Sequence, residues 1–313
     1  MFYTWTGRTD NQKGNRFHEV VRNVDSEKLE MVNRRHFSLV GFESDEGVRR
    51  NQGRVGASKA PNKIRSFLSN ISYSSNHKNV IDIGNVTCVD NNMEEAQVNL
   101  SEKVEKLLNN NYTPIILGGG HETFYGHYLG ARKSVGENKK IGMINLDAHF
   151  DLRKDNVPSS GTMFNQILAK GNKDDYLCIG LQELSNTSEL FLNAKELDVK
   201  YILETDLFPL EKTFKKIDTF AREQDFFIYT ICSDVINQSS APGVSAPAPF
   251  GLEPSVVRKI THHVIKQPNF LSMDVSEVNP IYDVADQTSR LISYIIGETL
   301  MRLNKSNGGE VND

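Results

Sequence analysis

The run Lys140-Ile-Gly-Met-Ile-Asn-Leu-Asp-Ala-His-Phe-Asp-Leu-Arg153 decides the fold of this 313-residue chain. Its first part, Ile141–Leu146, is apolar and has the length of a strand. Three ligand-type side chains follow at once: Asp147, His149 and Asp151. Side chains two apart face the same side of an extended backbone, and open α/β sheets bind ligands just beyond the carboxyl ends of their strands. The run therefore predicts an α/β sheet with a ligand site at one edge. The plainer alternative is a helix N-cap at Asp151 beside a surface histidine.

Similar apolar runs recur along the chain, with amphipathic, helix-like stretches between them. The other strand-like runs are His36–Phe42, Val80–Gly84, Pro114–Leu117, Tyr176–Ile179, Lys200–Leu203, Phe226–Cys232 and Asn269–Met273. The helix-like stretches include Met93–Asn109, Glu211–Arg222, Pro254–Val264 and Gln287–Leu303. This alternation predicts a mostly parallel sheet with helices on both faces, a three-layer α-β-α fold.

One domain spanning residues 1–313 is the simpler interpretation, with an N-terminal segment at 1–20 and a polar tail at 304–313 that we expect to fray. Two stretches, Arg49–Pro61 and Asn237–Gly251, are typical of long loops, which often carry active-site residues.

The composition of the chain argues against several classes of protein. The net charge of -4 gives no reason to expect nucleic acid or an anionic membrane as partner. The three cysteines are far apart and form no CxxC, which argues against a disulfide framework. The N-terminus lacks the pattern of a signal peptide, and no apolar run is long enough to span a membrane. We therefore expect a cytoplasmic protein.

Two further strand ends carry ligand-type side chains. Pro114–Leu117 is followed by the glycine run Gly118-Gly119-Gly120, which delivers His121 to the sheet edge. A glycine run before a helix would alternatively cradle phosphate, but no GxxxxGK[ST] motif is present. Phe226–Cys232 ends in Cys232-Ser-Asp234, again two ligands spaced by two. The alternative is a buried free cysteine followed by a turn aspartate.

A fourth strand leads into Ser272-Met-Asp-Val-Ser-Glu-Val-Asn-Pro280. Asp274 and Glu277 in this segment are interpreted as capping or turn residues, unless Glu277 faces a substrate.

Mixed aspartate and histidine ligands suit divalent ions such as Mn²⁺, with Zn²⁺ or Fe²⁺ as alternatives. Two such ions about 3.5–4 Å apart share a bridging water and lower its pKa, so that a hydroxide attacks an electrophilic carbon. Ser159-Ser160-Gly161 lacks the context of a nucleophilic serine. The sequence thus favours a metal-dependent hydrolase.

These motifs together resemble the arginase family of ureohydrolases, which cleave C–N bonds of guanidino and amidino groups. The resemblance covers nearly the whole chain, from Gly53–Pro61 through GGGHE, DAHFD and Cys232–Pro247 to SMDVSEVNP. It implies a parallel sheet of about eight strands, a site for two Mn²⁺ ions per subunit and assembly into a homo-oligomer.

The resemblance also implies roles for single residues. Glu277 would pair with the cationic nitrogen end of the substrate. Cys232 stands where most members have an aspartate that bridges the two metal ions. The remaining implied metal ligands are His121 and Asp151 for the first ion, His149 and Asp234 for the second, and Asp147 as a bridge.

Within the family, several departures are similar to formimidoylglutamases, which hydrolyse N-formimidoyl-L-glutamate to L-glutamate and formamide in histidine degradation. These are the Trp5-Thr-Gly-Arg8 start, the GGGHE form, Arg153 and the run Ala241–Pro247. A guanidinium at Arg153 would bind a substrate carboxylate bidentately. Ser160 is a further expected substrate contact, and Arg8 or Arg54 is a weaker candidate for a second positive one.

Phe164 replaces the histidine that arginases carry as a proposed proton shuttle. We therefore assign Asp151 the transfer of the water's proton to the leaving nitrogen, and Glu277 the stabilisation of the amidinium. The alternatives are another ureohydrolase, agmatinase or arginase, and a non-catalytic homologue whose metal site is incomplete at Cys232. His127, His262 and His263 are interpreted as surface or packing residues.

Overall fold

A computed structural model describes residues 2–9, 16–73, 79–171 and 173–308. Its centre is a nine-stranded sheet with the order β1-β3-β2-β4-β9-β8-β5-β6-β7, and every pair of neighbouring strands is parallel. The strands are β1 (Arg22–Asn23), β2 (His36–Glu43), β3 (Val80–Thr87), β4 (Tyr112–Leu117), β5 (Ile141–Leu146), β6 (Asp175–Leu181), β7 (Lys200–Leu203), β8 (Phe226–Cys232) and β9 (Phe270–Ser276).

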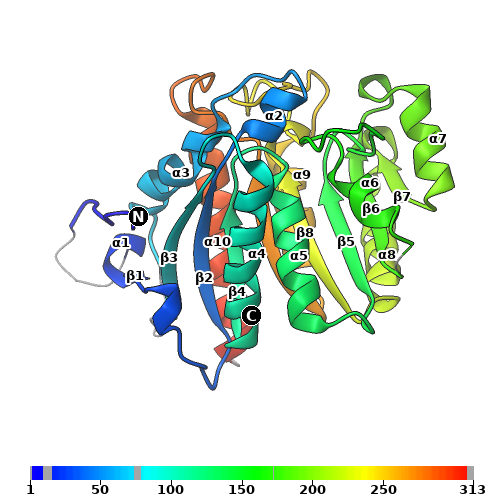
Figure 1. Ribbon diagram of the computed structural model, residues 1–313. Helices are drawn as coiled ribbons and strands as arrows, with labels where there is room; N and C mark the ends of the chain where they lie inside the picture. Colours follow the sequence, from blue (N-terminus) through cyan, green and yellow to red (C-terminus); the bar gives the residue numbers. More distant parts are fainter. Residues whose placement is uncertain (1, 10–15, 74–78, 172, 309–313) are drawn as a thin grey trace.

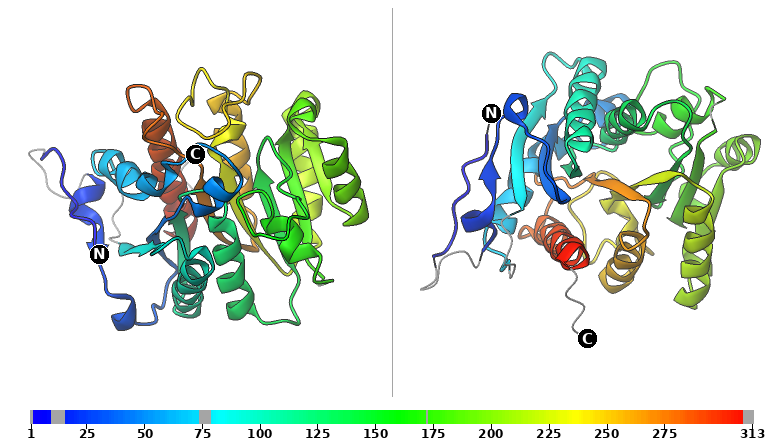
Figure 2. Two further views of the ribbon diagram at one scale, coloured as in Figure 1. Left: turned by 45° about the horizontal axis from the view of Figure 1, so that its top comes forward. Right: turned by 90° about the horizontal axis from the view of Figure 1, so that it is seen from below.

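Helices cover both faces of the sheet, which confirms the three-layer prediction (Figures 1 and 2). The helices are α1 (Phe17–Val20), α2 (Glu46–Arg50), α3 (Ala60–Leu68), α4 (Met93–Asn109), α5 (Thr123–Val135), α6 (Met163–Leu168), α7 (Ser188–Glu196), α8 (Leu210–Arg222), α9 (Pro254–Val264) and α10 (Gln287–Gly308). The apolar faces of α3, α8, α9 and α10 share one core with the sheet, and α4, α5 and α6 pack on the opposite face.

Alternation along each strand feeds these two cores. In β8, Phe227, Tyr229 and Ile231 pack on the side of α8, α9 and α10, whereas Ile228 packs on the side of α5 and α6. Because both faces are covered, the strands consist of nearly continuous apolar residues, which is typical of a parallel sheet.

Each of the eight predicted strand runs forms a strand. The sheet has one strand more than the expected number of about eight. The additional strand, β1, has two residues, both exposed at the edge of the sheet, so no apolar pattern marks it. The prediction of one loop over Arg49–Pro61 is partly wrong. Residues 49–50 end α2, where both arginines bond to Glu46, and α3 already begins at Ala60.

The tail that we expected from residue 304 onward is helical in its first part, since α10 continues to Gly308. The buried Asn304 side chain accepts a hydrogen bond of 2.6 Å from Asn79, which ties this residue of α10 to the body of the protein. Residues 309–313 lie outside the described residues. In the part of the chain that the structure describes, no helix is both long and apolar enough to cross a membrane.

The strand order places four neighbouring strands, β4, β9, β8 and β5, at the middle of the sheet. Their carboxyl ends lie at the upper edge in Figure 1, beneath α2 and the loops. The chain leaves β4 for β5 and later fills the gap with β8 and β9, so this edge is the topological switch point where open α/β sheets bind ligands.

Candidate metal centre and active-site cavity

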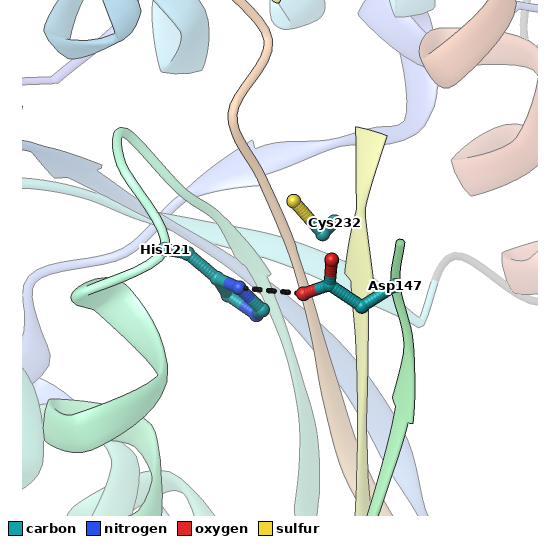
Figure 3. Close-up of side chains that lie close together, drawn as sticks. All are labelled: His121, Asp147 and Cys232. Carbon is teal, nitrogen blue, oxygen red and sulfur yellow. Dashed lines mark ion pairs between the residues drawn. The ribbon is translucent and has the colours of Figure 1, made fainter. Parts of the chain in front are cut away.

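Each of the four central strands delivers predicted site residues to the same edge of the sheet. His121 follows β4, Asp147 follows β5, Cys232 ends β8 and Glu277 follows β9. In Figure 3, the side chains of His121, Asp147 and Cys232 converge from three separate chain segments. Ligands that are far apart in sequence thus meet because parallel strands end at one edge.

Asp147 is the shared member of two clusters of possible metal ligands. The first contains His121, Asp147 and Cys232, the second Asp147, His149 and Asp234, and in each the ligand atoms lie within 4.8 Å of one another. The Oδ2 atom of Asp147 is 3.1 Å from His121 Nδ1, and Oδ1 is 3.5 Å from His149 Nδ1. One carboxylate oxygen therefore faces each cluster, which is the arrangement that a bridging ligand requires.

Asp151 adjoins the first cluster. Its Oδ2 atom is 2.9 Å from His121 Nδ1, so this nitrogen faces the carboxylates of both Asp151 and Asp147. The backbone of Asp151 has a φ of 51°, a left-handed conformation that a residue other than glycine rarely adopts. Such a conformation costs about 1–3 kcal/mol and is often found at functional sites.

The charges of the cluster are strongly coupled. Burial opposes the ionisation of Asp147, but hydrogen bonds with His121 and His149 outweigh it and hold its pKa well below the usual range. Burial would lower the pKa of His121, yet Asp147 and Asp151 raise it well above the ordinary value. Burial and the charge of Asp147 raise the pKa of Asp151. The site thus concentrates negative charge that a cation would balance.

The donor set fits divalent cations. Asp234 Oδ1 is buried and has no hydrogen-bond partner among the described residues, although Oδ2 lies 3.3 Å from His149 Nδ1. Such a buried carboxylate oxygen, in a residue that adjoins an imidazole, is suited to bind a divalent cation. Cys232 is the exceptional donor, because burial, followed by the charge of Asp147, raises the pKa of its thiol well above the ordinary value.

Glu277 is held in one orientation by the glycine run. Its backbone N–H donates to Gly119 O at 2.8 Å, and its Oε1 accepts a hydrogen bond of 2.8 Å from the backbone N–H of His121. The other oxygen, Oε2, is buried and without a partner within the described part of the chain. Burial and the charge of Asp234 raise the pKa of this carboxyl well above its usual range. A cationic ligand beside Oε2 would satisfy it.

A cavity of about 390 Å³ opens over the cluster. The predicted site residues in its wall are His121, His149, Asp151, Cys232, Asp234 and Glu277, together with Arg153 and Ser160. Asp147 is fully buried beneath them. The structure therefore brings every predicted site residue to one place, while their individual roles stay predictions.

Of the two weaker candidates for a positive contact, only Arg54 lines the cavity. It is fixed by hydrogen bonds to the carbonyls of Ser245 and Val244 and by the ring of Tyr282, 4.5 Å away. Arg8 lies by Asn70, apart from the cavity wall.

One interpretation is wrong. Asp274, expected as a capping or turn residue, lies inside β9 and is fully buried. Phe164 is also fully buried, stacks on Tyr176 at 3.9 Å and does not line the cavity.

Some residues at or near the site were not predicted from the sequence, because loops bring them there. Glu122 accepts hydrogen bonds from Gly47 N and Ser44 Oγ, at 2.9 and 3.0 Å, and so ties α2 to the glycine run. Burial raises its pKa to about 7. Asn51 and Asn186 also line the cavity. The GGGHE motif was a usable signal for Glu122, whereas nothing in the local sequence marks the two asparagines.

The arginase family model matches residues 35–301. The chain belongs to the arginase family. A formimidoylglutamase of Geobacillus sp. (strain WCH70) is 42% identical over 308 residues, which cover 96% of this chain and 95% of that relative.

Two solved structures share the arginase-family fold. That of a formimidoylglutamase from Bacillus subtilis has a TM-score of 0.84 at 22% identity, covering 95% of this chain and 94% of the other. A Trypanosoma cruzi formiminoglutamase with Mn²⁺ has a TM-score of 0.77 at 24% identity, covering 90% and 99%. The family and these relatives identify this arginase-family chain as a hydrolase of amidine C–N bonds.

Proposed function

We propose that this chain hydrolyses N-formimidoyl-L-glutamate to L-glutamate and formamide, a step of histidine degradation, at a centre for two Mn²⁺ ions. The observation that carries the proposal is that the cavity wall contains both an acidic and a basic side chain. This wall contains the buried carboxyl of Glu277, whose Oε2 has no hydrogen-bond partner among the described residues, and the exposed side chain of Arg153. A substrate with an amidinium at one end and carboxylates at the other matches both charges.

The metal centre would be held by the two clusters that share Asp147. His121, Asp151 and Cys232 surround one position, and His149 and Asp234 the other. When bound, the ions supply Lewis acidity and activate water for attack on the amidine carbon. Manganese is supported by the carboxylate and imidazole donors and by the Mn²⁺ of the Trypanosoma cruzi relative.

The protein side chains orient the substrate and move the proton. Glu277 would bind the amidinium and keep its carbon electrophilic. Asp151 would accept the proton of the attacking water and pass it to the nitrogen of the departing glutamate. The C–N bond between that nitrogen and the formimidoyl carbon then breaks, so that one water yields formamide and L-glutamate.

Glutamate leaves two carboxylates to bind, and the cavity has two arginines to bind them. Arg153 is exposed at the rim, and Arg54 is fixed in the wall by two backbone carbonyls. We assign one carboxylate to each, because a guanidinium binds a carboxylate in a planar, bidentate way. Ser160, which also lines the cavity and lies 3.3 Å from the side-chain nitrogen of Asn51, would add a hydrogen bond.

The deciding experiment assays the purified, Mn²⁺-loaded protein against N-formimidoyl-L-glutamate, L-arginine and agmatine in parallel. We expect turnover of the first alone, because the other two carry a net positive charge and would meet the like charge of Arg153. Hydrolysis of agmatine alone would instead indicate an agmatinase. Inactivity on all three, with little bound metal, would favour a non-catalytic homologue limited by Cys232.

Replacement of Arg153 by methionine should raise KM for N-formimidoyl-L-glutamate about 10- to 100-fold and leave kcat nearly unchanged. A hydrogen-bonded charge pair contributes about 1.5–3 kcal/mol, and the carboxylates are remote from the reacting carbon. Steady-state kinetics measure the effect. Arg222→Met, an exposed position on α8, is the matched control and should keep the wild-type KM. An unchanged KM in Arg153→Met would exclude the carboxylate contact.

Replacement of Cys232 by aspartate should tighten Mn²⁺ binding at least about tenfold. A carboxylate is a harder ligand than a thiolate and is the better match for Mn²⁺. The buried thiol, whose pKa is raised, must also lose a proton on binding, so wild-type affinity should rise with pH more steeply than that of the variant. Calorimetric titration of the metal-free protein with Mn²⁺ at several pH values measures both effects.

The control for Cys232→Asp is Cys178→Ser, which changes the other fully buried thiol near the site. Cys178 Sγ lies 3.4 Å from the carbonyl of His149 but belongs to neither ligand cluster. Its variant should bind Mn²⁺ as the wild type does. If Cys232→Asp altered neither stoichiometry nor affinity, Cys232 would not be the limiting ligand.

A further inference from the structure

A series of buried, hydrogen-bonded polar side chains runs from the back of His121 along the face of the sheet that α5 covers. The front of the imidazole, Nδ1, faces Asp151 and Asp147 at 2.9 and 3.1 Å. The back, Nε2, lies 3.0 Å from the hydroxyl of Thr230, in β8. That hydroxyl donates to Asp274 Oδ1, in β9, at 2.7 Å. Thr230 and Asp274 are both fully buried, so water does not compete for these bonds.

The residues at the far end of this hydrogen-bonded series hold Asp274 in place. Its Oδ1 also accepts a hydrogen bond of 3.1 Å from Ser276 Oγ, and its Oδ2 lies 2.7 Å from His127 Nδ1. His127 Nε2 in turn lies 2.6 Å from Ser272 Oγ. The carboxylate is thus bonded on both oxygens by residues of β9 and α5. A buried network in which every member is satisfied fixes the orientation of its members.

The direction of each hydrogen bond follows from the number of protons available. An ionised carboxylate only accepts, so the single hydroxyl proton of Thr230 is committed to Asp274. Toward His121, Thr230 can then only accept, and the hydrogen in that bond must come from Nε2 of the imidazole. A neutral His121 therefore has a bare Nδ1, on the side where the other ligand atoms converge.

We propose that Asp274, acting through Thr230, fixes His121 as the tautomer protonated on Nε2 and so presents Nδ1 as a metal ligand. Thr230 and Asp274 are positioning residues in this scheme, and His127 serves by holding Asp274. The inference rests on the proposed function, since it takes His121 to be a ligand of Mn²⁺. Partners behind a ligating histidine typically change metal affinity about 10- to 100-fold.

The test compares Mn²⁺ affinity in variants of Thr230, measured by calorimetry without substrate. Thr230→Val has nearly the same shape and lacks the hydroxyl, so it should weaken binding of one ion about 10- to 100-fold. Thr230→Ser keeps the hydroxyl and should restore wild-type affinity. Asp274→Asn should bind more weakly than Thr230→Val, because an amide N–H can donate to Thr230 and turn its hydroxyl toward Nε2, favouring the tautomer with a blocked Nδ1.

Thr261→Val is the matched control, because Thr261 is also fully buried and its hydroxyl bonds to Tyr229 at 3.0 Å, on the opposite face of the sheet. It should lower the melting temperature as Thr230→Val does without changing Mn²⁺ affinity. If the wild type binds two Mn²⁺ ions and Thr230→Val binds both with the same affinity, the inference is rejected and the proposed function stands. If the variants show the expected differences in Mn²⁺ affinity but the wild type does not turn over N-formimidoyl-L-glutamate, only the proposed substrate is rejected.

Discussion

Asparagine at position 151 is expected to lower kcat for N-formimidoyl-L-glutamate by about 10²- to 10⁴-fold, the usual effect of losing a general acid–base group. The amide has the shape of the carboxylate and keeps an oxygen that can face a metal ion, but it cannot accept the proton of the attacking water. The assay is run at saturating Mn²⁺, and the metal content of the same sample is measured, so that weaker metal binding is separated from slower chemistry.

Asp155→Asn is the control for the Asp151 variant. Asp155 is exposed, lies four residues further along the same loop and does not line the cavity, so its variant should keep wild-type kcat and metal content. An Asp151→Asn protein that retained both ions and turned over at a near-normal rate would show that the proton is transferred by another group.

Glutamine at position 277 should reduce kcat/KM by about 10²- to 10³-fold while both Mn²⁺ ions stay bound. The side-chain oxygen can still accept the hydrogen bond from the His121 backbone, so the local structure is preserved. The amide nitrogen, however, brings a donor to the place where the amidinium would lie. Removing one partner of a buried charge pair typically costs about 2–5 kcal/mol.

The conservative variant Glu277→Asp separates charge from position. It keeps the negative charge but shortens the side chain, so we expect an activity between those of wild type and Glu277→Gln. Steady-state kinetics and metal analysis on all three proteins provide the comparison. If Glu277→Gln lost its metal as well as its activity, Glu277 would be acting on the ligand cluster and not on the substrate.

Much of the site was predictable because its residues follow strands. Asp147, His121 and Cys232 each come directly after or at the end of an apolar run, and parallel strands carry their carboxyl ends to one edge. Register and order of the sheet were not needed for that prediction, only the alternation of strands and helices. The two-residue strand β1 shows the limit, since an exposed edge strand has no apolar pattern to detect.

The supporting contacts were not predictable from local patterns. Asp274 resembles a turn residue in the sequence, yet β9 continues to Ser276 and buries it among polar partners from β8 and α5. Arg54 could be chosen over Arg8 only once the loop before α3 was seen to form part of the cavity wall. In both cases the deciding contact joins segments more than 40 residues apart in the chain.

The place of β9 in the sheet also bears on synthesis by the ribosome. β9 is the last strand along the chain, yet it alone joins β4 to β8. In a nascent chain that ends before residue 270, the strands β1-β3-β2-β4 and β8-β5-β6-β7 would lack the strand that connects them, and each group would have an open edge that is prone to misassembly. His121 belongs to the first group, and Asp147 and Cys232 to the second. The predicted ligands would then meet only when β9 is inserted, so under the proposed function we expect the metal ions to bind after that step.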